Sequence, residues 1–108
     1  MKRKTIRKYK DFITLPSDPS VANDYFVTKA KAAAKPDARY GLVAPKKIFK
    51  LAVQRNRVKR LLRDWIAANE DLMLPDFDYI FIARESILEC SRDTGRAKVA
   101  QALKKISK

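Results

Sequence analysis

The longest predicted helix occupies residues 51–69, whose sequence is LAVQRNRVKRLLRDWIAAN. Apolar side chains recur in it at Val58, Leu61, Leu62, Trp65 and Ile66. This spacing follows the α-helical period of about 3.6 residues and places these side chains on one side of the helix. A helix with such a stripe buries it, so we expect this helix to pack on the rest of a folded domain.

The opposite side of this helix is basic. Guanidinium groups bind phosphate oxygens in pairs, a lysine adds a point charge, and an asparagine offers a neutral donor and acceptor. No acid within residues 46–63 relieves the repulsion between these like charges, so we expect a polyanionic partner to supply the counter-charge. The residues turned away from the apolar stripe are Asn56, Lys59, Arg60 and Arg63, and those at its edges are Arg55 and Arg57.

The chain as a whole is also basic. Its 108 residues carry 25 Lys and Arg against 12 Asp and Glu, a net charge of +13. Residues 46–63 hold eight bases and no acid, and residues 1–10 hold six bases and no acid, whereas residues 64–89 hold seven acids and one base. Two basic blocks on one domain are typical of a nucleic-acid-binding surface. The length predicts a single domain over residues 1–108.

The rare residue types exclude several kinds of site. The chain has no histidine, which removes the commonest general base and metal ligand. Its single cysteine, Cys90, excludes an internal disulfide and a cysteine zinc site and suits a reducing cytosol, so we expect a cytoplasmic protein. No apolar run approaches the roughly 18 residues of a membrane span, and the polar sequence after Met1 predicts no signal peptide.

Shorter segments supply the other elements. Residues 5–15 have apolar side chains at helical spacing before Pro16, which predicts a short first helix. Residues 25–31, 39–44 and 79–83 contain aromatic and branched apolar side chains between turn residues, which predicts three strands.

A last helix is expected after Ser91, which is a suitable N-cap, although Gly95 lowers the helix propensity of its first turn. The order helix, strands, long helix, strand, helix places a strand–helix–strand crossover at the centre of the chain. We therefore expect an α+β fold, a small two-layer sandwich with a sheet of about four strands, three helices and a β-α-β crossover.

Residues 55–63 have the spacing R-N-x-x-K-R-x-x-R, and Lys46-Lys47 precede them after a strand that contains a glycine. This run and its surroundings resemble the bacterial ribonuclease P protein family. The resemblance extends over essentially the whole chain, and this run in this context is specific to the family. Further matches follow in the family's order at Asp11-Phe12, Ser20–Asn23, Gly41–Val43 and Tyr79–Arg84.

The resemblance implies a fold and a function. It implies that the β-α-β crossover is left-handed, whereas right-handed crossovers are the rule. It also implies the small subunit of an endoribonuclease that removes the 5′ leader from precursor tRNA. In this family the RNA subunit performs the Mg²⁺-dependent hydrolysis, so no catalytic residue and no dedicated metal site are expected in this chain. The implied partners are the catalytic RNA, with one protein per RNA, and precursor tRNA.

Carried over to matching positions, the resemblance also implies an RNA-binding surface and a cleft for the single-stranded leader. The chain departs from the family pattern at Leu15, where a second cleft aromatic is usual, and at Lys29, where a tyrosine is frequent. The linker before the arginine run is one residue longer than in the family, and in it Phe49 replaces a glycine and offers an aromatic ring at a new place. Phe12, which the resemblance places in the cleft, fits a role in core packing equally well. The implied RNA-binding residues are Lys46, Lys47, Arg55, Asn56, Arg57, Lys59, Arg60 and Arg63, and the implied leader-cleft residues are Phe12, Lys29 and Arg84.

Three other functions are compatible with parts of the sequence. A nuclease site in the chain itself would need converging carboxylates to hold a metal ion, for which the candidates are Asp76 with Asp78 or Glu70 with Asp71. A non-catalytic RNA-binding module such as a ribosomal protein, or an architectural DNA-binding protein, would have the same charge. A basic helix with an apolar face also binds membrane surfaces, but the strands around this helix favour burial of that face.

Overall fold

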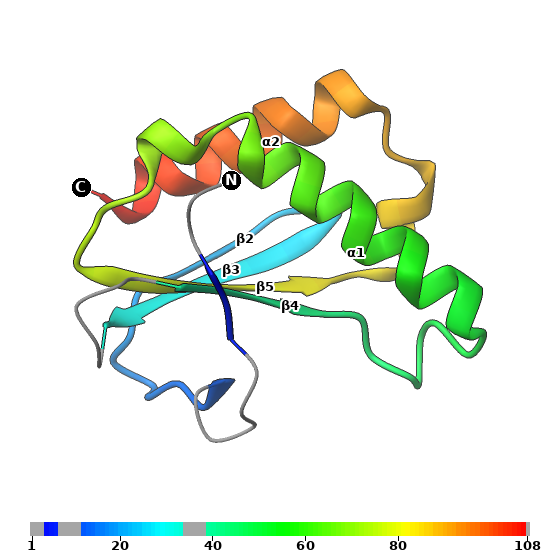
Figure 1. Ribbon diagram of the computed structural model, residues 1–108, viewed down its shortest axis with the longest axis horizontal. Coiled ribbons are helices and arrows are strands. Elements are labelled where there is room, and N and C mark those ends of the chain that lie inside the picture. The colour runs from blue at the N-terminus through cyan, green and yellow to red at the C-terminus, as the bar shows by residue number, and fades with distance from the viewer. Residues whose placement is uncertain (1–3, 7–11, 34–38, 108) are drawn as a thin grey trace.

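The computed structural model describes residues 4–6, 12–33 and 39–107. In these residues two α-helices cover one face of a five-stranded sheet, whose strand order is β1-β4-β5-β3-β2 (Figure 1). The strands are β1 (Lys4–Thr5), β2 (Ser20–Ala22), β3 (Phe26–Ala32), β4 (Arg39–Val43) and β5 (Phe77–Ala83). The helices are α1 (Ala52–Ala67) and α2 (Arg92–Ile106), with short 3₁₀ turns η2 (Glu70–Leu72) and η3 (Glu85–Glu89).

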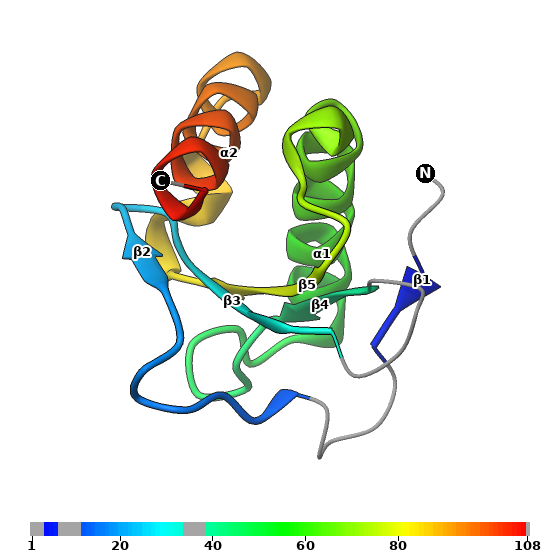
Figure 2. The same ribbon diagram turned by 90° about the vertical axis from the view of Figure 1, so that its left-hand side faces the viewer.

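A β-α-β crossover forms the centre of the fold. β4 and β5 are parallel neighbours joined through α1, and β5 also pairs antiparallel with β3. In Figure 2 both β4 and β5 run away from the viewer, and the chain passes from β4 on the right, over α1, to β5 on its left. A path that turns anticlockwise as it recedes is left-handed, against the usual rule. The α+β class is confirmed, and the crossover has the hand that the resemblance implies.

The predicted numbers of strands and helices are wrong. The described residues form five strands and two α-helices, not about four strands and three helices. β1 and β2 span two and three residues, too few to produce a recognisable alternation in the sequence. The strands predicted at 25–31, 39–44 and 79–83 are present as β3, β4 and β5, with ends displaced by at most two residues.

The first predicted helix, residues 5–15, is not formed at either of its described ends. Lys4–Thr5 is strand β1, and the N–H of Ile6 donates to a carbonyl oxygen of β4 at 2.8 Å. Residues 13–15 are in no helix, and residues 7–11 lie outside the described residues. Pairing with the sheet edge satisfies the backbone hydrogen bonds of residues 4–6 and buries Ile6. The helical spacing of the apolar residues in 5–15 gave no sign of this pairing.

The core lies between the helices and the sheet. The ring of Phe26 has its centroid 6.5 Å from that of Trp65 and 6.0 Å from that of Phe81, and all three side chains are buried. A Cβ atom on Gly95 of α2 would lie 2.1 Å from Cε2 of Trp65. The glycine that weakens the predicted helix is therefore the residue that lets α2 approach α1 closely.

Hydrogen bonds at the helix ends cap α2 and link α1 to it. Ser91 is confirmed as the N-cap of α2, because its Oγ accepts a 3.2 Å hydrogen bond from the N–H of Thr94. Asn69, just beyond α1, donates from Nδ2 to the carbonyl oxygens of Trp65 and Arg96, both at 2.9 Å. The bond from Asn69 to the carbonyl oxygen of Arg96 therefore links the end of α1 to α2.

The membrane-surface interpretation needs an exposed apolar face on α1. That face is buried against the sheet and α2, since Val58, Leu62 and Trp65 are all 0% exposed. Nowhere in the described ranges is a helix long and apolar enough to cross a membrane.

Candidate nucleic-acid interface

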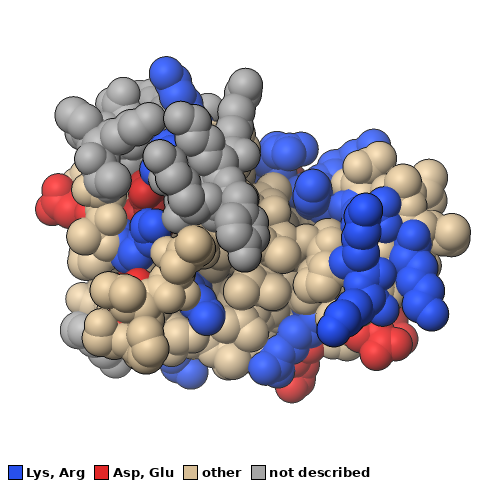
Figure 3. Space-filling view, turned by 90° about the horizontal axis from the view of Figure 1, so that it is seen from below, with Lys and Arg blue, Asp and Glu red and all other residues tan. Residues whose placement is uncertain are grey.

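The outer face of α1 is exposed and basic, as the helical spacing predicts. Asp64, the one acid of α1, forms an ion pair with Arg96 of α2 at 3.0 Å and therefore does not neutralise this face. In Figure 3, which shows the molecule from below, basic side chains gather at the end formed by the β4–α1 loop and the start of α1. The exposed residues of this face are Asn56, Arg57, Lys59, Arg60 and Arg63.

The β4–α1 loop extends the basic face. Lys46 and Lys47 are exposed, as is Lys50, which sequence reasoning left out although it lies in the same block without acids. The loop turns on Pro45, whose carbonyl oxygen accepts from the N–H groups of residues 48 and 49 at 3.1 and 2.9 Å. Phe49 is only 2% exposed and belongs to the core. The idea that Phe49 offers a new aromatic for stacking is therefore wrong, because its ring anchors the loop.

Arg55 differs from the other arginines of α1. It is half-buried, and its Nη1 donates to the carbonyl oxygens of Phe49 at 2.8 Å and Lys50 at 3.0 Å. The prediction places this side chain at an edge of the apolar stripe, but it lies seven residues before Leu62, on the side of the stripe itself. There it folds back onto the loop that carries the lysines and holds it, whereas Arg57 is exposed.

The face of the sheet away from the helices carries two of the three predicted leader-cleft residues. A Cβ atom on Gly41 of β4 would lie 2.5 Å from Cε1 of Phe12, so the Phe12 ring lies directly on the strand. Phe12 is half-buried, which leaves part of its side chain accessible. Gly41 is needed here for close approach, since any side chain would displace the ring.

Lys29 lies on the same face, two strands away. It is opposite Ile80 of β5, which is in turn opposite Gly41, so the three residues form one row across the sheet. Neighbouring strands are about 4.8 Å apart, which places Lys29 roughly 10 Å from Gly41. Lys31, two residues further along β3, has the same orientation, and its Nζ donates to the carbonyl oxygen of Ile13 at 3.1 Å. Strand alternation would have revealed Lys31, which sequence reasoning omitted.

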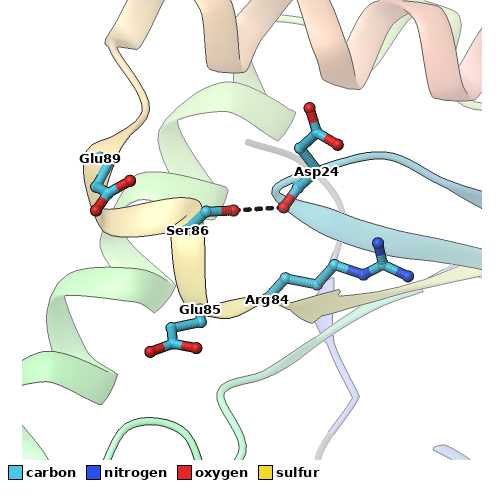
Figure 4. A pocket seen from close by; sticks show the side chains of 5 residues that line it. All are labelled: Asp24, Arg84, Glu85, Ser86 and Glu89. Atoms are coloured by element: carbon cyan, nitrogen blue, oxygen red, sulfur yellow. Dashed lines mark hydrogen bonds between the residues drawn. The ribbon is translucent and has the colours of Figure 1, made fainter.

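Arg84 does not join this pair. It follows β5 and lies four residues from Ile80, roughly 13 Å along an extended strand. Its Nη1 donates to the carbonyl oxygen of Asn23 at 2.9 Å. It lines an open pocket of about 440 Å³. Figure 4 shows it in this pocket, near the hydrogen bond that Ser86 Oγ donates to the carbonyl oxygen of Asp24. The other lining residues include Glu85 and Glu89, so this surface is more acidic than the rest of the predicted cleft.

The four carboxylates suggested for a nuclease lie outside α1, and one of them has a structural role. Asp78 is 1% exposed and accepts from the backbone N–H of Arg39 at 2.7 Å and from its Nη2 at 3.3 Å. Glu70 and Asp71 lie in the turn η2. Over the described ranges, no group of three or more Asp, Glu, Cys or His side chains could hold a metal ion.

Cys90 has the environment of an ordinary half-buried thiol. Burial raises its pKa above the usual value, and this effect exceeds the lowering by the charge of Lys98 and by a hydrogen bond with Tyr25. A thiol with a raised pKa is protonated at neutral pH and is a poor nucleophile.

Comparison with known proteins gives one consistent family. The family described as Ribonuclease P matches residues 1–107. The chain is 36% identical over 73 residues to the ribonuclease P protein component of Halorhodospira halophila, which covers 68% of this chain and 59% of that protein. It is 28% identical over 106 residues to the ribonuclease P protein component of Desulforapulum autotrophicum, and this match covers 97% of this chain and 90% of that protein. The chain thus spans about three-fifths of the length of the first of these relatives and nine-tenths of the second.

Solved structures show the same fold. The RNase P protein from Thermotoga maritima superposes with a TM-score of 0.79 at 29% identity, covering 96% of this chain and 98% of that chain. The RNase P protein from Staphylococcus aureus gives a TM-score of 0.77 at 30% identity, covering 95% and 94%.

Proposed function

The chain belongs to the ribonuclease P protein family, and on this premise we propose that it is the protein subunit of a ribonuclease P holoenzyme. The holoenzyme is an endoribonuclease that removes the 5′ leader from precursor tRNA. In this proposal the RNA subunit performs the hydrolysis, and this chain binds the RNA subunit and the leader. One protein binds one RNA, and the complex works in the cytoplasm.

The basic outer face of α1 is the observation that carries the proposal. Its apolar side is buried in the core and its neighbouring helix is tied to it through Asp64 and Arg96, so the basic side chains are presented on a rigid element. Asp64, the one acid of α1, is paired with Arg96 and does not compete for them. Phosphate contacts of this kind dominate affinity for nucleic acid and make it depend steeply on salt.

The charge of the protein also supplies a role in the assembled enzyme. Precursor tRNA and the RNA subunit are both polyanions, and a domain with a net charge of +13 lowers the repulsion between them. The protein therefore replaces part of the Mg²⁺ that would otherwise screen the two RNAs. The Mg²⁺ that activates the attacking water is held by the RNA subunit in this proposal.

The leader crosses the sheet face that lies away from the helices. Phe12 offers a partly accessible ring on which an unpaired base stacks, a contact worth about 1–3 kcal/mol per base. Lys29, in the same row of the sheet, contacts the phosphate backbone. Arg84, just beyond the end of β5, contacts a more distant part of the leader.

Cleavage of a 5′-labelled precursor tRNA at low Mg²⁺ tests the proposal. The three samples are the protein alone, the RNA subunit of the same organism alone, and the two together. We expect cleavage at the mature 5′ end only when both are present. Cleavage by the protein alone would show a catalytic site in this chain. Tight RNA binding that does not restore cleavage would favour a non-catalytic RNA-binding module.

A further inference from the structure

An aliphatic surface is exposed where α1 begins. Ile48 is 42% exposed, Leu51 62% and Val53 75%, and we call these three residues the aliphatic surface. Isolated exposed apolar side chains are ordinary on soluble proteins. Here three lie within six residues, and Val53 precedes Arg57 by four residues, which places it on the same outer face of α1. The aliphatic surface is therefore continuous with the basic face.

Two of these residues stand where helix stability favours a different residue type. Leu51 is the N-cap of α1, and its side chain offers no acceptor to the first-turn N–H groups. Gln54 Oε1 already accepts a hydrogen bond from the N–H of Leu51 at 3.4 Å, so a serine at position 51 would complete a capping box. Val53 is β-branched and mostly exposed, so it adds neither helix propensity nor burial. Natural proteins break such local rules mainly at functional or strained sites.

The aliphatic surface is held in place before any partner binds. Phe49 anchors the loop in the core, and Arg55 donates to two consecutive carbonyl oxygens of the same loop. A surface that is ordered in advance loses less conformational entropy when it binds.

The charge around the aliphatic surface selects its occupant. Lys46, Lys47, Lys50 and Arg57 are exposed beside it, and residues 46–63 contain no acid. A second copy of this chain, also with a net charge of +13, would be repelled. The partner must therefore be anionic and must also offer apolar faces. Unpaired nucleotides in RNA loops and bulges have both, because their phosphates are charged and their bases are not covered by stacking.

We propose that the aliphatic surface packs against unpaired nucleobases of the RNA subunit, while the lysines and Arg57 around it contact the flanking phosphates. The proposal rests on the proposed function, since it takes the RNA subunit as the partner. It adds a contact that forms only with unpaired RNA bases, in addition to the phosphate contacts of the outer face of α1.

Binding of the isolated RNA subunit, without tRNA, at several salt concentrations tests the proposal. The test protein is the full chain with Leu51→Ser and Val53→Ser together. We expect its Kd to rise about tenfold with an unchanged slope of log K against log salt, because no phosphate contact is lost. Its Tm should not fall, because the serine introduced at the N-cap completes the capping box. Arg60→Gln should instead lower the slope by about 0.7–0.9.

Two controls separate a base contact from other effects. Leu15→Ser removes a leucine that is 65% exposed outside the aliphatic surface, and its Kd should equal that of the wild type. A fully paired RNA duplex should bind the double variant and the wild type equally, because its base faces are stacked.

Three results would overturn the inference. The first is a double-variant Kd equal to that of the wild type, and the second is an equal loss on the duplex. The third is a wild-type dimer in sedimentation that the double substitution disperses, which would assign the aliphatic surface to a second copy. Failure of the wild type to bind the RNA subunit would refute the proposed function instead, so the two failures are distinguishable.

Discussion

Arg55 binds the backbone of Phe49, with Nη1 2.8 Å from the carbonyl oxygen, while the Phe49 ring is buried in the core. One side chain of the basic helix thus stabilises the loop that precedes it. The arginine run of residues 55–63 therefore contains two kinds of side chain, one that shapes the surface and several that are free to bind.

Arg55→Gln should loosen the loop, whereas Arg57→Gln should not. Losing two hydrogen bonds from a charged donor should cost about 1–2 kcal/mol of unfolding free energy. Amide hydrogen exchange of residues 46–51 in the free protein should become faster. Arg57→Gln removes the same charge from an exposed side chain and is the matched control. Equal exchange rates in the two variants would show that Arg55 does not hold the loop.

Arg60→Gln and Arg63→Gln should weaken binding of the RNA subunit and leave the fold intact. Both side chains are exposed on the outer face of α1. Leu62, between them in sequence, is 0% exposed, and Leu62→Ala should cost about 2–5 kcal/mol of stability. Urea unfolding and RNA titration of the three variants separate the two effects. A loss of unfolding free energy in Arg60→Gln as large as that in Leu62→Ala would contradict the assignment of Arg60 to the surface.

Gly95→Ala should destabilise the protein although alanine is the better helix former. The added Cβ would lie 2.1 Å from Cε2 of the Trp65 ring, which is rigid and 0% exposed. Overpacking of this kind costs about 1–3 kcal/mol. At an exposed helical site the same change would stabilise by roughly 1 kcal/mol. The sign of the change in unfolding free energy therefore shows whether overpacking or helix propensity dominates at Gly95. A gain in stability would contradict the close packing of α1 and α2.

Phe12→Ala should weaken the binding of precursor tRNA to the assembled holoenzyme more than the binding of mature tRNA. The ring is partly accessible on the sheet face of the proposed leader path, and mature tRNA has no leader to stack on it. The loss should be about 1–3 kcal/mol for precursor tRNA, or roughly 5- to 150-fold in Kd. Equal loss for the two RNAs would mean that Phe12 only packs against β4.

Parts of this structure could be predicted from sequence because their causes are local. The stripe from Val58 to Ile66 specifies α1, and Ser91 is a cap that bonds to the residue three positions later. Strand β1 could not be predicted, because its two residues are extended only through pairing with β4. The outer face of α1 follows from the period of the helix alone.

The roles of Arg55 and Gly95 could not be predicted for the same reason. Arg55 binds carbonyl oxygens whose position depends on burial of Phe49, and Gly95 matters because the Trp65 ring lies against it. Each of these contacts joins two segments whose spatial proximity no local sequence pattern indicates. Phe12 and Lys29 are brought onto one face only by the register of β3, β4 and β5.

Holoenzyme cleavage of precursor tRNA by two matched triple variants tests the central claim most directly. One variant carries Arg57→Gln, Arg60→Gln and Arg63→Gln on α1, and the other carries Arg92→Gln, Lys104→Gln and Lys105→Gln on exposed positions of α2. Both lose three positive charges. We predict that at low Mg²⁺ the α1 variant loses at least about tenfold in cleavage rate, because charge-assisted contacts are lost, and that high Mg²⁺ restores it. The α2 variant should cleave as the wild type does. Equal cleavage by the two variants would contradict the claim that the outer face of α1 binds the RNA subunit.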